Sequence, residues 1–227
     1  MNASGVSQKH FLLPTHVKER SSEPFFGTQE KDVNQLLQKF NEFKSIVNYK
    51  IVYEFEDGNT IEFVPKQTDF PHLIGLHKLV DIPIIRQFND KSNQTVSAKF
   101  LISKIKKETI LTEDVIKGSV NFGKIEDRYN RFNKENILSL SYTDAIIDFN
   151  PAMIGSDLKA KYVLYEEKEQ GCYNHLCIAE ADADKKYLES FFYEPSDLYL
   201  RNQKKIKIKN VKIFDNKGNL YLEDTLC

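Results

Sequence analysis

Residues 49–80, YKIVYEFEDGNTIEFVPKQTDFPHLIGLHKLV, contain two different hydrophobic periods in succession. Apolar residues first alternate with polar ones over 51–55 and 61–63, on either side of Asp57-Gly58. This alternation predicts a β-hairpin, because the glycine can adopt the positive φ that a tight turn requires.

After the hairpin, the period becomes that of a short helix over residues 69–82. Asp69 is expected to cap this helix, Pro71 to occupy its first position and Pro83 to end it. The apolar residues expected on its shared face are Leu73, Leu76, Leu79 and Val80.

Helical periods also occur on both sides of this stretch. Upstream, a helix is expected to begin at Thr28, and its apolar face comprises Val33, Leu36, Leu37, Phe40, Phe43, Ile46 and Val47. Downstream, two helices are expected within 94–117, the second beginning at Thr112, and a further helix over 122–138. Residues 1–27 show no sustained period and are interpreted as an N-terminal arm.

From Tyr142 onward, the sequence consists of short β-rich runs separated by turns. These runs are 145–149, 161–167, 175–181, 189–194 and 206–214. Helices followed by strands predict an α+β fold with an antiparallel sheet. We therefore expect one α+β domain over 28–227, with helices in 28–140 and the sheet mainly in 142–223.

Composition excludes several classes of protein. The 32 Lys and Arg nearly balance the 33 Asp and Glu, so attraction to nucleic acid would require a local patch. No apolar run approaches the roughly 18 residues of a membrane span. The apolar run at 11–13 is too short for a secretory signal, and the three cysteines are too few for a disulfide scaffold. We therefore expect a cytoplasmic protein without a membrane partner.

Common enzyme motifs are also missing from the sequence. It contains no P-loop, no G-x-G-x-x-G after a strand, no H-E-x-x-H and no G-x-S-x-G. These absences exclude the corresponding nucleotide-binding, zinc-protease and serine-hydrolase classes.

His72 and His77 are the first candidates for chemistry. On a regular helix their separation turns them roughly 140° apart, so they are not expected to bind one metal ion as i, i+4 ligands do. Each could face a cleft if Gly75 bends the segment, or could simply satisfy helix backbone groups. Spacing alone leaves both interpretations open.

Cys172, His175 and Cys177 form a C-x-x-H-x-C cluster that could supply zinc ligands or a nucleophilic thiol. No second ligand pair follows at zinc-finger spacing, and a cysteine in a strand more often packs as a small hydrophobic residue. Neither a metal site nor a cofactor is therefore expected.

The segment RNQKKIKIKNVK, residues 201–212, carries basic residues and no acidic one. Alternation predicts that Lys205, Lys207 and Lys209 share one exposed face of a strand. Such a face could contact the phosphates of a nucleic acid, or could protect a sheet edge against strand addition.

The segment FPHLIGLHKL (70–79), directly after the hairpin, resembles a phage-associated branch of the barnase/EndoU/colicin/RelE-like nuclease superfamily. IEDRYNRF (125–132) resembles its arginine-bearing helix, and AIIDFNPAMIGSDLKAKYVLYEE (145–167) resembles the strands that follow. ESFFYEPSDLYLRNQKKIKIKNVKIF (189–214) resembles its Ser-Phe-Phe element and basic terminal strand. Together the similar segments span residues 32–214.

The resemblance implies N-terminal helices packed on an antiparallel sheet of four to five strands, with a metal-independent ribonuclease site on the open face. Enzymes of this superfamily typically cleave RNA through attack by the 2′-hydroxyl. The resemblance implies His72 or His77 as general base or acid, with Arg128 and Ser190 binding phosphate. The RNA-binding residues that it implies are Arg131, Lys205, Lys207 and Lys209.

Three functions remain open from the sequence. The first is an endoribonuclease that cleaves RNA, with tRNA as one candidate substrate. It would act in a bacterial cell as a phage or mobile-element toxin, with an immunity protein as a further partner. The second is a catalytically inactive module that binds nucleic acid or an acidic protein. The third is a phage inhibitor of a host defence protein. RNA cleavage in EDTA, a salt-dependent gel shift and co-purification with one host protein would distinguish them.

Overall fold

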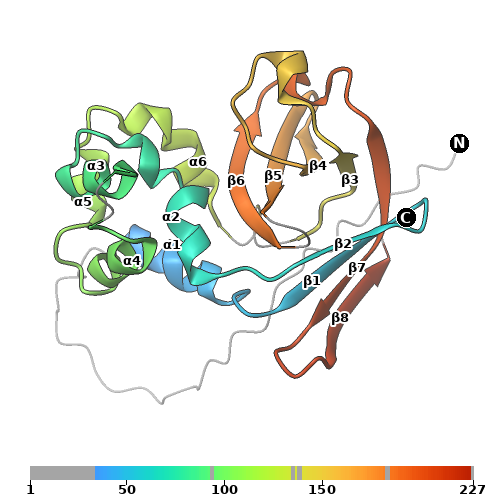
Figure 1. The fold of residues 1–227 in the computed structure, drawn as a ribbon, viewed down its shortest axis with the longest axis horizontal. Coiled ribbons are helices and arrows are strands. Elements are labelled where there is room, and N and C mark those ends of the chain that lie inside the picture. The colour runs from blue at the N-terminus through green and yellow to red at the C-terminus, as the bar shows by residue number, and fades with distance from the viewer. Residues whose placement is uncertain (1–33, 93–94, 134–135, 137–139, 182–184, 226–227) are drawn as a thin grey trace, which may run out of the picture.

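The structure is a computed structural model that describes residues 34–92, 95–133, 136, 140–181 and 185–225. A layer of short helices lies beside a curled sheet, and most of the strands come from the second half of the chain (Figure 1). The predicted arm of residues 1–27 and the predicted helix start at Thr28 lie outside the described residues.

Among the described residues, six short α-helices form the helical layer. They are α1 (Gln35–Lys44), α2 (Phe70–Leu73), α3 (Pro83–Asn89), α4 (Ala98–Lys106), α5 (Glu113–Lys117) and α6 (Glu126–Arg131). The 3₁₀ turns used below are η1 (Gln67–Asp69), η2 (Leu76–Lys78), η3 (Phe122–Lys124), η5 (Pro151–Ile154) and η6 (Leu198–Leu200). The predicted start at Thr112 is confirmed, because its hydroxyl caps α5 by accepting from the Val115 N–H. Within the described ranges, every helix is too short or too polar to cross a bilayer.

The sheet is antiparallel and has eight strands. They are β1 (Lys50–Phe55), β2 (Thr60–Phe63), β3 (Asp144–Ile147), β4 (Tyr162–Glu169), β5 (Cys172–Glu180), β6 (Lys186–Glu194), β7 (Lys205–Phe214) and β8 (Leu220–Thr225). The expected four to five strands was therefore too few. The expected number did not include the predicted hairpin, which is confirmed as β1 and β2, and it did not include β8. Strands β1 and β8 each pair with β7, and β2 joins the sheet through β1.

Strand β7 connects the two halves of the sheet, whose order is β2-β1-β7-β3-β4-β5-β6. One edge of β7 pairs with β1, where Ile51 lies opposite Ile213. Its other edge pairs first with β3 and then with β8. The sheet curls enough for β2 to contact β6, so the two ends of the strand order approach each other.

Aromatic side chains dominate the core between the helices and the sheet. Phe70 packs edge-on against Phe40 and Phe132, at centroid distances of 5.2 and 5.4 Å. Phe132 in turn meets Phe191 of β6 at 6.0 Å, which joins the helical layer to the sheet. A smaller apolar cluster that includes Cys177 and Leu200 packs separately from this core.

The predicted helix over 69–82 is wrong as a continuous element. It ends after α2 because Gly75 adopts a left-handed conformation with φ of 87°, and the chain then forms η2. Pro83 begins α3 rather than ending a helix. The carboxylate of Asp69 accepts a hydrogen bond from the Lys66 N–H at 2.8 Å and makes no capping bond to α2.

Gly75 also allows α6 to approach this turn closely. A Cβ atom built on Gly75 would lie 2.8 Å from Cγ2 of Ile125 and 3.2 Å from Cδ of Arg128. The predicted helix over 122–138 is shorter in its described part, where η3 precedes α6 and α6 ends at Arg131. The turn at Gly75 and helix α6 thus form one side of the site described next.

Candidate functional site

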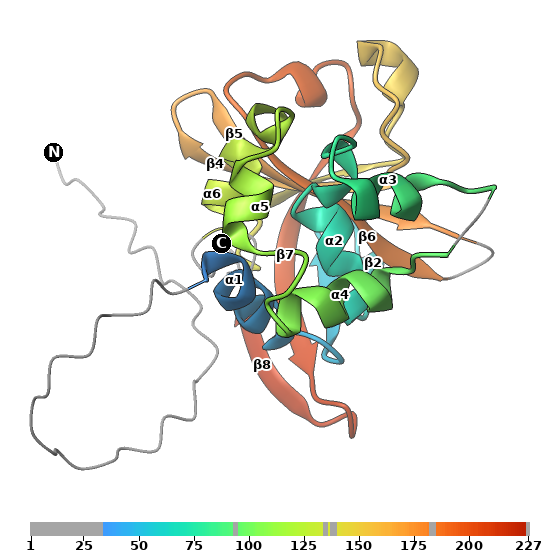
Figure 2. The ribbon, with the colours of Figure 1, turned by 90° about the vertical axis from the view of Figure 1, so that its left-hand side faces the viewer.

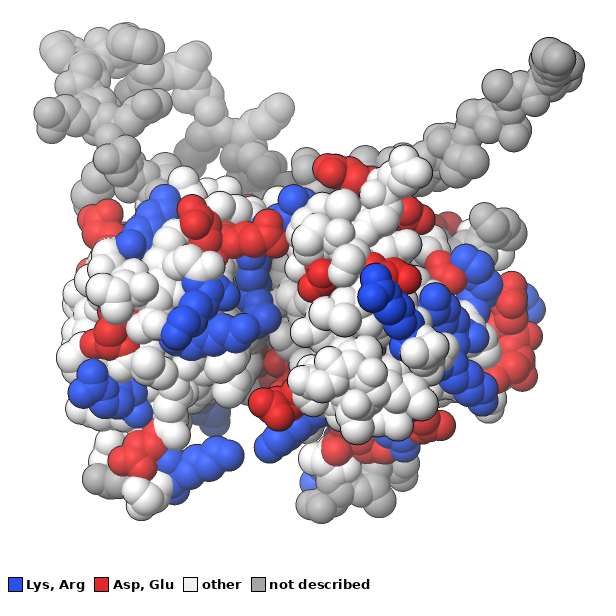
Figure 3. All heavy atoms as spheres, turned by 90° about the horizontal axis from the view of Figure 1, so that it is seen from above, with Lys and Arg blue, Asp and Glu red and all other residues white. Residues whose placement is uncertain are grey.

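A cavity of about 650 Å³ lies between the helical layer and β6. All four residues expected to carry chemistry line it: His72, His77, Arg128 and Ser190. They come from three distant parts of the chain, namely the α2–η2 segment, α6 and β6. Viewed from above, the molecule is hollowed between its two layers, and Lys and Arg side chains gather on the helical side of the hollow (Figure 3).

The two histidines face each other across the bend at Gly75. Their ring centroids are 5.1 Å apart, and the His72 ring also packs against Phe88 at 5.4 Å. A regular helix would have turned the rings apart, so the left-handed glycine is what lets both rings line one cavity. The sequence-based alternative in which Gly75 bends the segment is therefore the one that the structure adopts.

Both imidazoles are uncharged at neutral pH in the structure. Burial lowers the pKa of His72. Burial, aided by the nearby cations Arg128 and Lys78, lowers the pKa of His77 to about 4. An uncharged imidazole can accept a proton, so either ring can act as a base.

Arg128 is a buried cation beside this histidine pair. It is 8% exposed, and its Nη1 donates to the carbonyl oxygen of His72 at 3.4 Å. Among the described residues, no carboxylate forms an ion pair with Arg128. A buried charge is costly without a counterion, so the cavity is suited to an anion that the guanidinium can hold by two parallel hydrogen bonds.

Ser190 enters the cavity from an irregular point in β6. Cys177 pairs with Ser190 and Ile178 pairs with Leu188, so Glu189 is an extra residue that forms a β-bulge. Bulges redirect side chains, and here both Glu189 and Ser190 line the cavity. Burial raises the pKa of Glu189. No sequence pattern indicates a role for this carboxylate, because nothing in the run ESFFYE marks the position of a bulge.

The rim of the cavity combines cationic and aromatic groups. Lys78 and Lys124 lie on the helical side, and Phe192, Tyr193 and Tyr199 form the opposite wall. Arg131 reaches this rim: its guanidinium lies 3.7 Å from the Tyr193 ring centroid, and its Nε pairs with Oδ1 of Asp127 at 2.9 Å. These groups can bind phosphates and can stack against bases.

The sequence of this chain matches the model of a nuclease family. The family model described as phage-Barnase-EndoU-ColicinE5/D-RelE like nuclease4 (PBECR4) matches residues 35–219, a range that includes every cavity residue named above. The chain belongs to this family. Neither a curated protein nor a solved structure matches it.

The predicted basic face lies apart from the cavity. Lys205, Lys207 and Lys209 are exposed on β7 and the intervening Ile208 is buried, so the predicted alternation is confirmed. None of the three lysines lines the cavity, and Lys207 forms an ion pair with Asp144 at 2.6 Å. Their assignment to RNA binding stays a prediction.

The C-x-x-H-x-C cluster lies on β5. His175 is completely buried and stacks on Phe192 at 4.8 Å, and Cys177 is buried within the smaller apolar cluster. Burial raises the pKa of the Cys177 thiol, which disfavours the thiolate that a nucleophile needs. In the described part of the chain, no three His, Cys, Asp or Glu side chains are arranged to hold a metal ion.

Proposed function

We propose that this protein is a metal-independent endoribonuclease that cleaves RNA by transesterification through the 2′-hydroxyl. The observation that carries the proposal is the buried Arg128, which has no carboxylate partner among the described residues and lies beside two uncharged imidazoles in one cavity. A phosphodiester supplies the missing negative charge and places its neighbouring hydroxyls next to groups that transfer protons.

His77 is assigned as the general base. Arg128 and Lys78 oppose its protonation, so it stays uncharged and ready to accept the proton of the 2′-hydroxyl. His72 is assigned as the general acid, because burial is the cause that lowers its pKa and a bound phosphate raises that pKa again.

The proposed reaction forms the bond between the 2′-oxygen and phosphorus and breaks the bond between phosphorus and the 5′-oxygen. The 2′-hydroxyl proton passes to His77, and the leaving 5′-oxygen receives a proton from protonated His72. Arg128 holds the non-bridging oxygens as negative charge develops on them, and the Ser190 hydroxyl donates to one of them. The products are a 2′,3′-cyclic phosphate and a 5′-hydroxyl.

We also propose the biological setting of this activity. The family description names phage and the colicins E5 and D, which supports an RNA-cleaving toxin or effector of phage origin that acts within a bacterial cell. A tRNA is the first substrate to test, and an immunity protein or a host defence protein is the protein partner to seek.

The test of this function is cleavage of a defined tRNA pool in EDTA, with the 3′ ends mapped chemically. Wild-type protein should leave 2′,3′-cyclic phosphates, and H72A and H77A should each reduce the rate by about 10²- to 10⁴-fold. The matched control is H175F, which changes a buried histidine that does not line the cavity.

Two outcomes would refute the proposed function. One is intact RNA after incubation with folded wild-type protein, which would favour a binding module with the same fold. The other is equal cleavage by wild type and by the H72A/H77A double variant, which would show that the activity does not come from this cavity.

A further inference from the structure

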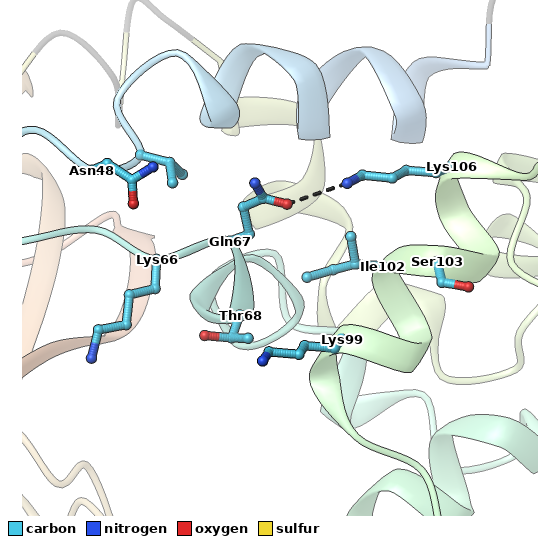
Figure 4. A pocket seen from close by; sticks show the side chains of 9 residues that line it. Asn48, Lys66, Gln67, Thr68, Lys99, Ile102, Ser103 and Lys106 are labelled. Atoms are coloured by element: carbon cyan, nitrogen blue, oxygen red, sulfur yellow. Dashed lines mark hydrogen bonds between the residues drawn. The ribbon is translucent and has the colours of Figure 1, made fainter. Parts of the chain in front are cut away.

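A second cavity lies at the other end of the segment that carries His72. It measures about 540 Å³ and is formed by the turn after α1, by η1 and by α4. Three lysines, Lys66, Lys99 and Lys106, line it together with the apolar side chains of Val47 and Ile102 (Figure 4). We refer to it as the α4 pocket.

Helix α4 contributes four of the lining residues, because their spacing places them on one face of the helix. Lys99, Ile102, Ser103 and Lys106 recur at steps of three, one and three, which places them on one face of the helix. Leu101 and Ile105 fall on the adjacent buried face and hold α4 against the core. The nine residues of α4, AKFLISKIK, contain no acidic side chain that could neutralise the lysines.

The lysines of the α4 pocket form no ion pair within the described ranges. The ion pairs found there include none of Lys66, Lys99 and Lys106. Burial raises the pKa of the nearby Asp69 carboxyl, and this rise is opposed by the charge of Lys66 and by the hydrogen bond that the carboxyl accepts from the Lys66 backbone N–H. Lys106 is instead fixed by neutral groups, since its ammonium donates to Oε1 of Gln67 at 3.2 Å and lies 5.1 Å from the Phe40 ring centroid. Lys66 and Lys99 lie on opposite sides of Thr68 (Figure 4).

This chemistry suits one nucleotide unit of an RNA strand. Lysine ammonium groups bind phosphate as point charges, and the hydroxyls of Thr68 and Ser103 can donate to phosphate or sugar oxygens. Val47 and Ile102 offer an apolar surface for a sugar or a base. The volume lies within the range of about 300–1,000 Å³ that is usual for small-ligand pockets.

The position of the pocket favours RNA that also occupies the catalytic cavity. Thr68 lines the α4 pocket and His72 lines the catalytic cavity, and η1 leads directly into α2 between them. Four helical residues span only about 6–8 Å along the axis. In Figure 2, α4 lies below α2 and α6 lies to its upper left. Helix α4 lines the α4 pocket and α6 lines the catalytic cavity, so α2 lies between the helices that line the two pockets. A strand of several nucleotides can therefore reach both.

We propose that the α4 pocket is a second RNA-binding site, which holds a phosphate of the same strand whose scissile phosphate lies between His72, His77 and Arg128. This proposal rests on the proposed ribonuclease function. It predicts that long RNA binds through both pockets, whereas a dinucleotide binds in the catalytic cavity alone.

The experiment measures binding of fully 2′-O-methylated RNA, which lacks the attacking hydroxyl and cannot be cleaved. A dinucleotide and a long single strand are titrated at several potassium chloride concentrations against wild type, K66Q/K99Q and the control K91Q/K107Q. The control removes the same charge from two exposed lysines that do not line the pocket. Lys106 is left unchanged because of its contacts with Gln67 and Phe40.

For the long strand, K66Q/K99Q should reduce the slope of log K against log salt by about 0.7, since the pocket holds one phosphate and each phosphate contact on a single strand contributes about 0.7. The control should keep the wild-type slope, and the dinucleotide should bind all three proteins equally. An unchanged slope for K66Q/K99Q, or an equal reduction in the control, would overturn the proposal.

A parallel titration with adenosine monophosphate tests a free nucleotide as the occupant. Binding of this nucleotide that K66Q/K99Q abolishes, with an unchanged slope for long RNA, would overturn the RNA assignment. Because the RNA used here is not cleaved, failure of catalysis in the tRNA assay and failure of this second site are separate results.

Discussion

Replacing Gly75 with alanine should destabilise the protein more than the same change at a left-handed glycine whose surroundings are open, because Gly75 has close neighbours. Alanine at φ of 87° costs about 1–2 kcal/mol in backbone strain. The new Cβ would also lie 2.8 Å from Cγ2 of Ile125, and overpacking of this kind costs about 1–3 kcal/mol. The free energy of unfolding should therefore fall by about 2–5 kcal/mol.

Gly58 provides the matched control for this change. Its φ is 82°, and a Cβ there would meet no atom within 4 Å, so G58A should lose only the backbone strain of about 1–2 kcal/mol. Urea unfolding followed by circular dichroism gives both values under the same conditions. Equal destabilisation of G75A and G58A would refute the argument that α6 requires the close approach at Gly75.

The same pair of variants tests how the site is assembled. The alanine Cβ at position 75 would lie 3.2 Å from Cδ of Arg128, so the guanidinium must shift relative to His72. RNA cleavage per folded molecule should fall in G75A and remain at the wild-type level in G58A. A G75A protein that is fully active when folded would show that the position of Arg128 does not depend on this contact.

Three further predictions concern individual side chains. Burial lowers the pKa of His175 to about 4, below its unfolded value of about 6.5, so protonation of His175 favours the unfolded state. The free energy of unfolding should therefore decrease by up to about 3 kcal/mol as the pH falls from about 6.5 to about 4. Urea unfolding of H175F over the same pH range should lack this decrease. R128K should lower kcat/KM for RNA by about 10- to 100-fold, because a charged hydrogen bond is worth about 1.5–3 kcal/mol. The control R201K, which alters an exposed ion pair, should keep the wild-type kcat/KM. If His77 is the base, E189Q should change the cleavage rate by only a few-fold, whereas a loss of 10²-fold or more would assign the base to Glu189.

Local patterns in the sequence predicted the parts of the fold that depend on neighbouring residues. The hairpin around Asp57-Gly58 and the start of α5 at Thr112 are both confirmed, since turn and capping chemistry act over a few residues. The strands predicted after Tyr142 are also confirmed, because alternation of apolar residues is a local pattern, but the predicted total number of strands was too low. Strand β8 follows β7 across the tight turn at 215–219, which is a local pattern that also predicts a hairpin. Pairing of β1 with β7 joins distant segments, and no local pattern reveals it.

The candidate site was predicted as a set of residues but not as a geometry. His72, His77, Arg128 and Ser190 were identified through a resemblance, and their convergence depends on Gly75 and on packing between α2, α6 and β6. Glu189 was missed because a bulge is set by strand pairing. The α4 pocket was missed because its lysines belong to separate elements that tertiary packing brings together.

The role of β7 determines when the fold can form during synthesis. Strand β1 is made early, yet its partner β7 begins only at Lys205, and Ser190 lies 15 residues before that strand (205 − 190). Pairing between such distant segments is slow because a long loop must close first. A nascent chain therefore carries both histidines and Arg128 well before it carries Ser190 and β7. Translation must proceed through β7 before the cavity that we assign to RNA cleavage can assemble.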